Sequence, residues 1–149
     1  MTAPARAHNA PAATATDVVV LHPAFVIAGR IMFTLIFFLS GLTHFTDLDS
    51  YVRLMPAAIP FRPFWVMISA AFELAGATMI LLNFRPRLGA WLIVLFLLPV
   101  TAVVHGGLMV AATDPQMQRI QLSFFLKGIT MAGAALLFTQ LGVGTARAR

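Results

Sequence analysis

Four long apolar runs follow one another along the chain, separated by short polar or proline-rich stretches. They cover approximately residues 24–42, 64–82, 88–112 and 122–141. Each is close to the roughly 20 residues that an α-helix needs to cross about 30 Å of hydrocarbon. The pattern predicts an all-α integral membrane protein built as a four-helix bundle. Pro99 predicts an interruption in the third helix, which neighbouring helices tolerate in a membrane.

The segments outside these runs differ from one another in character. The connection "TDLDSYVRLMPAAIPFRP" mixes apolar side chains such as Tyr51 and Leu54 with charges and prolines. It predicts an interfacial segment between the first two helices, with a short amphipathic helix over the mouth of the bundle. Residues 1–22 are rich in Ala, Pro and Thr and predict a disordered cytoplasmic tail. The expected organisation is this tail, a transmembrane domain at 23–142 and a basic C-terminal tail at 143–149.

Composition supports the membrane assignment and narrows the chemistry. The 149 residues are 60% hydrophobic and only 10% charged, whereas roughly a quarter of a soluble domain is charged. The net charge of +5 does not indicate nucleic acid, because the basic residues lie at the ends of apolar runs and form no patch. The expected partner is therefore the lipid bilayer. The absence of cysteine excludes thiol relay and thiolate-held metal or iron–sulfur sites on this chain.

The positions of the arginines predict the orientation. One side of the membrane holds more of them than the other, and this side should be cytoplasmic. The two sets are Arg6, Arg85, Arg87, Arg147 and Arg149 against Arg53, Arg62 and Arg119, the second set being offset by Asp47, Asp49 and Asp114. Both termini are then expected in the cytoplasm of a multi-pass protein.

Each predicted helix carries a polar residue that is costly in lipid, on a stripe of small or hydroxyl-bearing neighbours. Spacings of three and four place each stripe on one helix face, where small residues allow close helix contacts. The stripes are Arg30, Thr34, Phe37, Gly41 and His44; Ser69, Ala70, Glu73, Gly76 and Ala77; Thr101, Ala102 and His105; and Ser123, Lys127, Thr130 and Ala134. The prediction is that all four faces meet in one polar interior, with a buried network of Arg30, Ser69, Glu73, Thr101 and Thr130.

The depth of each residue suggests its partners. A rise of about 1.5 Å per residue places Glu73 near the middle, Lys127 above it and Arg30 below it. A lone charge in hydrocarbon costs at least about 2.5–3.5 kcal/mol, so we expect Glu73 to pair chiefly with Lys127 and secondarily with Arg30. Two interpretations stay open. In the first, the pairs only lock the bundle. In the second, they serve a ligand, because a buried ion pair is often no more stabilising than apolar packing and stability alone is a weak reason for one.

The histidines allow two further interpretations. His44 and His105 lie on different helices near the outer side, where they could ligate a haem b axially or simply form hydrogen bonds. Hydrogen bonding is the favoured interpretation, because the spacing indicates no room for a haem. No metal site is expected, since one carboxylate and two separated histidines do not give the usual ligand spacing.

Several short motifs resemble the DoxX family. They are "GR…F…SGLTHF", "IPF", "ELAGA…RPRLGAWL", "HGG" and "FFLKGI", spread over roughly residues 29–142. The resemblance implies a small four-helix membrane protein of the bacterial inner membrane, with relatives among membrane subunits of thiosulfate–quinone oxidoreductase and of redox-stress complexes. Carried over by position, the polar core of the family would be Arg30, His44, Glu73, His105 and Lys127.

The resulting hypothesis is a quinone-interacting subunit of a respiratory or redox-stress complex. Lys127 and His105 would donate to the quinone carbonyls in the outer half of the bundle, and His44 would exchange protons with water. Partner subunits of the redox complex or a homo-oligomer are expected. The alternative is a non-catalytic anchor or assembly factor whose buried polar residues are structural. A small transporter or proton relay is the third hypothesis, although no inverted repeat supports it.

Overall fold

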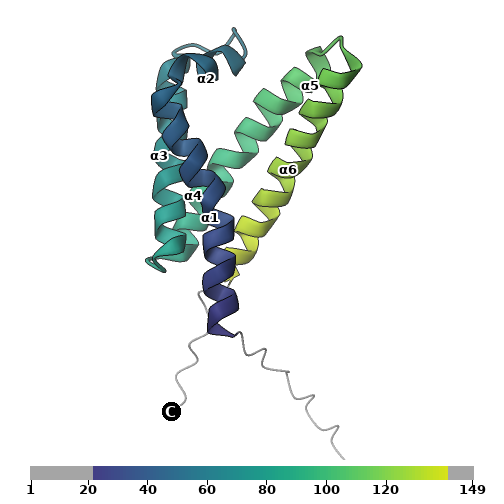
Figure 1. The fold of residues 1–149 in the computed structure, drawn as a ribbon. Coiled ribbons are helices and arrows are strands. Elements are labelled where there is room, and N and C mark those ends of the chain that lie inside the picture. Colours follow the sequence, from purple (N-terminus) through teal and green to yellow (C-terminus); the bar gives the residue numbers. More distant parts are fainter. Residues whose placement is uncertain (1–21, 141–149) are drawn as a thin grey trace, which may run out of the picture.

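Four membrane-length helical spans make up the part of the chain that the structure describes. This computed structural model describes residues 22–140, so both predicted tails, except His22, lie outside the described residues. The spans are α1 (Pro23–Thr46), α3 (Arg62–Leu81), a composite third span over Pro86–Ala111, and α6 (Pro115–Gln140) (Figure 1). The short helix α2 (Leu48–Leu54) lies between α1 and α3. The predicted all-α membrane fold and the short helix of the connecting segment are confirmed.

Proline marks the start of every span. Pro23, Pro63, Pro86 and Pro115 each occupy the first turn of their helix. Proline is suited to this position because the first N–H groups of a helix have no intrahelical acceptor and its φ is already helical. Before α6, the carboxylate of Asp114 also accepts hydrogen bonds from the backbone N–H groups of Gln116 and Met117.

The third span contains a π-helical segment. It consists of α4 (Pro86–Pro99), the π-helix η1 (Val100–Gly106) and α5 (Gly107–Ala111). Pro99 stands at the junction, where its ring displaces the carbonyl one turn earlier and its nitrogen cannot donate. A wider turn accommodates this defect, so the predicted interruption is present as a π-helix.

The spans form an open arrangement. α1 packs against α3, α3 against α4, and the third span crosses from α3 at its start to α6 at its end (Figure 1). Phe33, midway along α1, and Phe138, near the end of α6, bring these two helices into contact, with ring centroids 4.8 Å apart. Towards the end where α2 lies, here called the α2 end, the pair α1–α3 diverges from the pair α5–α6 in a V.

Glycines permit the closest helix contacts. A Cβ added at Gly76 would lie 2.8 Å from the carbonyl oxygen of Gly89, and one at Gly89 would lie 2.7 Å from that of Gly76. On α6, a Cβ at Gly128 would overlap the side chain of Thr101. Small residues therefore act as the sequence predicted, by letting helix backbones approach.

The predicted faces of the first two spans are confirmed, but the face of the fourth is wrong. Thr34, Phe37, Gly41 and His44 are buried on α1, and Ala70, Glu73, Gly76 and Ala77 are buried on α3. On α6 the buried residues are Gln121, Gly128, Ala132, Ala135 and Thr139, whereas Ser123, Lys127 and Thr130 are exposed. Close packing of Gly128 against Thr101 fixes the rotation of α6, so its polar stripe turns away from the core.

Candidate functional site

Two residues of α1, Ser40 and His44, contact the buried carboxylate of Glu73, and the three form a cluster. Glu73 on α3 is 1% exposed, and one of its oxygens, Oε2, accepts a hydrogen bond from the hydroxyl of Ser40 at 3.3 Å. The same oxygen lies 3.3 Å from Nδ1 of His44. Nδ1 is also 2.7 Å from the backbone carbonyl of Ser40. Because a carbonyl oxygen can only accept, Nδ1 must carry a hydrogen, which makes its contact with Glu73 attractive.

Helix direction explains why this pair forms. Side chains lean towards the N-terminus of their helix. α1 runs towards the α2 end, so His44 leans back into the bundle, where its ring reaches the carbonyl one turn earlier. α3 runs in the opposite direction, so Glu73 leans towards the α2 end. The two side chains therefore lean towards each other and meet at 3.3 Å.

Tyr51 on α2 covers the cluster. Its ring stacks on His44 with centroids 3.9 Å apart and planes inclined by 22°. Its hydroxyl lies 2.6 Å from the hydroxyl of the exposed Thr43. On the other side, Phe96 of α4 meets the His44 imidazole edge-on at 6.4 Å. The imidazole is thus held by a hydrogen bond, a stacked ring and an edge contact.

Lys127 does not join this cluster, so the predicted Glu73–Lys127 pair is wrong. Among residues 22–140 the single ion pair within 4 Å is His44–Glu73. Arg30 does not pair with Glu73 either, and its Nε is buried without a hydrogen-bond partner in the described part of the chain. The rotation of α6 described above carries Lys127 off the core-facing side of its helix and onto the side that faces the gap towards α1.

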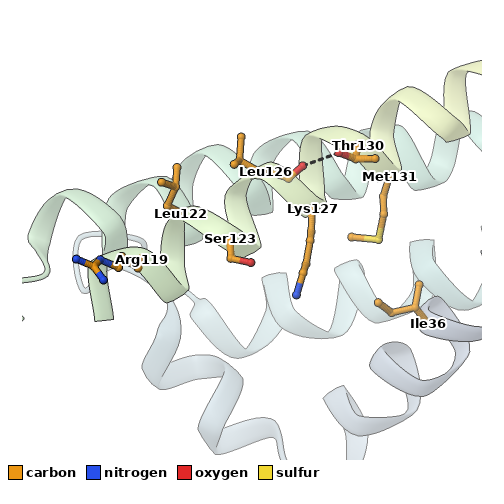
Figure 2. A pocket seen from close by; sticks show the side chains of 8 residues that line it. All are labelled: Ile36, Arg119, Leu122, Ser123, Leu126, Lys127, Thr130 and Met131. Carbon is orange, nitrogen blue, oxygen red and sulfur yellow. Dashed lines mark hydrogen bonds between the residues drawn. The ribbon is translucent and has the colours of Figure 1, made fainter. Parts of the chain in front are cut away.

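Lys127 instead lines an open groove between α6 and α1. The groove has a volume of about 490 Å³, and Figure 2 shows the lysine side chain extending into it. Most of the groove surface is apolar, although three side chains besides Lys127 are polar. The lining residues are Ile36, Arg119, Leu122, Ser123, Leu126, Lys127, Thr130 and Met131. The Nζ atom also lies 5.4 Å from the ring centroid of Phe124, within reach of a cation–π contact.

His105 belongs to the same region as Lys127. It sits in η1, where its Nδ1 is 3.1 Å from the side-chain oxygen of Gln121 on α6. Its ring stacks on Phe124, with centroids 5.3 Å apart. Phe124 therefore links His105 and Lys127, while His44 lies in the Glu73 cluster. The two histidines have separate neighbours, so this arrangement lends no support to an axial haem pair.

The remaining members of the predicted network are dispersed. Ser69 donates to the carbonyl of Val66 on its own helix, and Thr130 to that of Leu126. Thr101 is buried, but its role is packing against Gly128. These residues do not form one connected network.

Three residues that contribute to the clusters did not stand out in the sequence. Ser40, Tyr51 and Gln121 contact His44 or His105 in the structure. Ser40 could have been found, because it lies one turn before His44 on the same helix. The contacts of Tyr51 and Gln121 depend on how different helices pack, and local spacing does not report this.

Comparison with known proteins identifies a family. The model of the DoxX family matches residues 25–106, which is more than half of the 149-residue chain. The matched range includes Ser40, His44, Tyr51, Glu73 and His105, whereas α6 with Lys127 lies beyond it. No curated protein and no solved structure matches the chain.

Proposed function

The chain belongs to the DoxX family, and we propose that this multi-pass membrane protein is a quinone-interacting subunit of a respiratory or redox-stress complex. The proposed binding place is the groove between α6 and α1. Lys127 and His105 are the expected polar contacts. A quinone would supply two-electron redox chemistry, and this chain would supply its binding and orientation.

The observation that carries the proposal is the position of Lys127. It is the thirteenth of the 26 residues of α6, so its Cα lies about 18 Å along the helix. At this depth a cation needs a partner, yet no carboxylate in residues 22–140 lies within 4 Å of it. A quinone carbonyl fits the requirement, because the molecule dissolves in lipid and its oxygens accept hydrogen bonds.

The groove also provides the remaining parts of such a site. Leu122, Leu126 and Met131 give an apolar wall against which a ring and its isoprenoid tail can pack. Lys127 can donate a charge-assisted hydrogen bond to one carbonyl. His105, held by Gln121 through Nδ1 and stacked on Phe124, lies beside this region, and its Nε2 would donate to a second acceptor when both ring nitrogens carry a hydrogen.

Quinone titration tests the proposal. Purified protein in detergent would be titrated with a short-chain ubiquinone and with a menaquinone analogue, and thermal unfolding would be followed. The wild type should be stabilised by about 2.7 kcal/mol when the quinone is at a hundred times its Kd. Loss of a charge-assisted hydrogen bond costs about 1.5–3 kcal/mol, so Lys127→Met should bind at least tenfold more weakly. His105→Ala should bind more weakly than the wild type.

Arg87→Met is the matched control. Arg87 is an exposed cation at the start of α4, outside the groove, and its loss should leave quinone binding unchanged. Absence of stabilisation in the wild type, or an equal shift in all four proteins, would overturn the proposal.

One observation favours the alternative function, a non-catalytic anchor or assembly factor. The Glu73 carboxylate is satisfied within the chain by Ser40 and His44, so helix packing alone can account for this cluster. The groove would then receive a helix of a redox-complex subunit. In the titration above, this alternative is supported when no quinone stabilises the wild type.

A further inference from the structure

The His44–Glu73 pair is a buried titratable unit that quinone binding in the groove does not use. His44 is 5% exposed and Glu73 is 1% exposed. The titratable group facing Glu73 from α1 is His44, and α2 contributes Tyr51 above the imidazole. α4 contributes Phe96, which does not titrate. In the described part of the chain, no lysine or arginine forms an ion pair with the carboxylate.

Counting protons shows what this unit can do. With one proton in addition to the Nδ1 hydrogen, the pair is neutral overall, as imidazolium and carboxylate. The same holds when the extra proton sits on Glu73, which gives a carboxylic acid beside a neutral imidazole that keeps its Nδ1 hydrogen on the Ser40 carbonyl. Removing the extra proton leaves an uncompensated buried carboxylate, and adding a second leaves an uncompensated imidazolium. Both are costly away from water, so the geometry favours one labile proton.

Access to the pair is one-sided. Nδ1 of His44 is occupied by the Ser40 carbonyl and Glu73, while Nε2 has no hydrogen-bond partner within residues 22–140. Towards the α2 end, the Tyr51 ring covers the imidazole, and its hydroxyl contacts the exposed Thr43. Towards the opposite end, the next turns of α1 and α3 bury Phe37 and Ile80 almost completely. Water can therefore approach from the α2 end when Tyr51 moves.

We propose that His44 and Glu73 together form a binding site for one exchangeable proton, loaded from the α2 end past the ring of Tyr51. A hydronium ion at that surface transfers its proton to Nε2 and leaves as water. The pair then holds the proton either on the imidazole, as an ion pair with the carboxylate 3.3 Å away, or on Glu73 beside a neutral imidazole that keeps its Nδ1 hydrogen. The site lies between α1 and α3 and does not depend on a quinone in the groove.

A pH titration of the full chain in detergent tests the site. The ¹⁵N resonances of His44 and the infrared carboxyl bands of Glu73 would be followed together. One titration step common to both signals is expected, because coupled groups titrate as a unit. In Glu73→Gln the histidine step should change by about one pH unit or more, or disappear. Asp49→Asn, which removes an exposed carboxylate of α2, should leave the step in place.

Tyr51 provides the second arm of the test. Tyr51→Ala should make deuterium exchange at His44 Nδ1 about tenfold faster or more, because it removes the cover. Tyr51→Phe keeps the stacked ring without the hydroxyl, and its exchange should stay closer to the wild-type rate than that of the alanine variant. If Glu73→Gln does not fold, Glu73→Asp serves instead, since its shorter carboxylate should titrate separately from His44.

Independent titration of the two groups in the wild type would overturn the proposal. So would a histidine step that is identical in the wild type and in the Glu73 variant, or an exchange rate that Tyr51→Ala leaves unchanged. None of these results depends on quinone binding, and a failed quinone titration does not affect them.

Discussion

At the residue scale, the two ionisable side chains near the middle of their spans, Glu73 and Lys127, have different environments. Glu73 is enclosed by Ser40 and His44 within its own chain. Lys127 is exposed along a groove, with its Nζ over the Phe124 ring and with apolar side chains around it. The acid is therefore satisfied locally, whereas the base is available to an external acceptor. The contacts of Glu73 on α3 lie within the chain, whereas the proposed ligand binding involves Lys127 on α6.

A double-mutant cycle should show which pair is coupled. Glu73→Gln and His44→Phe remove the two partners of a contact, so their effects on stability should be non-additive by about 0.5–3 kcal/mol. Glu73→Gln and Lys127→Met, in contrast, should be additive within about 0.5 kcal/mol. Unfolding in detergent measures all five variants against the wild type. Strong coupling of Glu73 to Lys127 would contradict the geometry described above.

At the element scale, single glycines set how the helices fit. Gly76 and Gly89 allow α3 and α4 to approach backbone to backbone, and Gly128 accepts the side chain of Thr101. The second contact joins α6 to the π-helical segment, which also carries His105. Consequently, the packing that rotates Lys127 away from the core also determines where His105 lies.

Gly128→Ala should destabilise the protein. The new methyl group would overlap Thr101, and overpacking of this kind typically costs about 1–3 kcal/mol. Combining it with Thr101→Ala should recover part of the loss. Gly133→Ala on the same helix is the control, because its Cβ would meet nothing within 4 Å and stability should not fall. Equal losses from both alanine substitutions in detergent unfolding would argue against close packing at Gly128.

At the scale of the whole molecule, four spans place the two described ends on the same side. α1 begins and α6 ends beside each other, while α2 and α5 lie at the opposite end (Figure 1). This matches an even number of crossings, whichever side faces the cytoplasm. The V between the helix pairs leaves the groove open towards the α2 end.

Reporter fusions should place both termini in the cytoplasm. The prediction rests on the larger number of arginines on that side. A cytoplasmic reporter should be active after Arg149, and a periplasmic reporter should be active within residues 55–61. Periplasmic activity at the C-terminus would refute this orientation. Removing positive charge from the turn between α3 and α4, by Arg85→Gln and Arg87→Gln, should weaken the preference for this orientation.

The sequence by itself determined the fold class, the four spans and the buried faces of α1 and α3. It could do so because lipid requires long apolar helices, and because the spacing within one helix places its residues on a common face. Tertiary structure alone decided the partner of Glu73 and the rotation of α6. The first depends on opposed helices whose side chains lean towards each other. The second depends on the fit of Gly128 against Thr101, a contact between helices that no periodicity within either helix encodes.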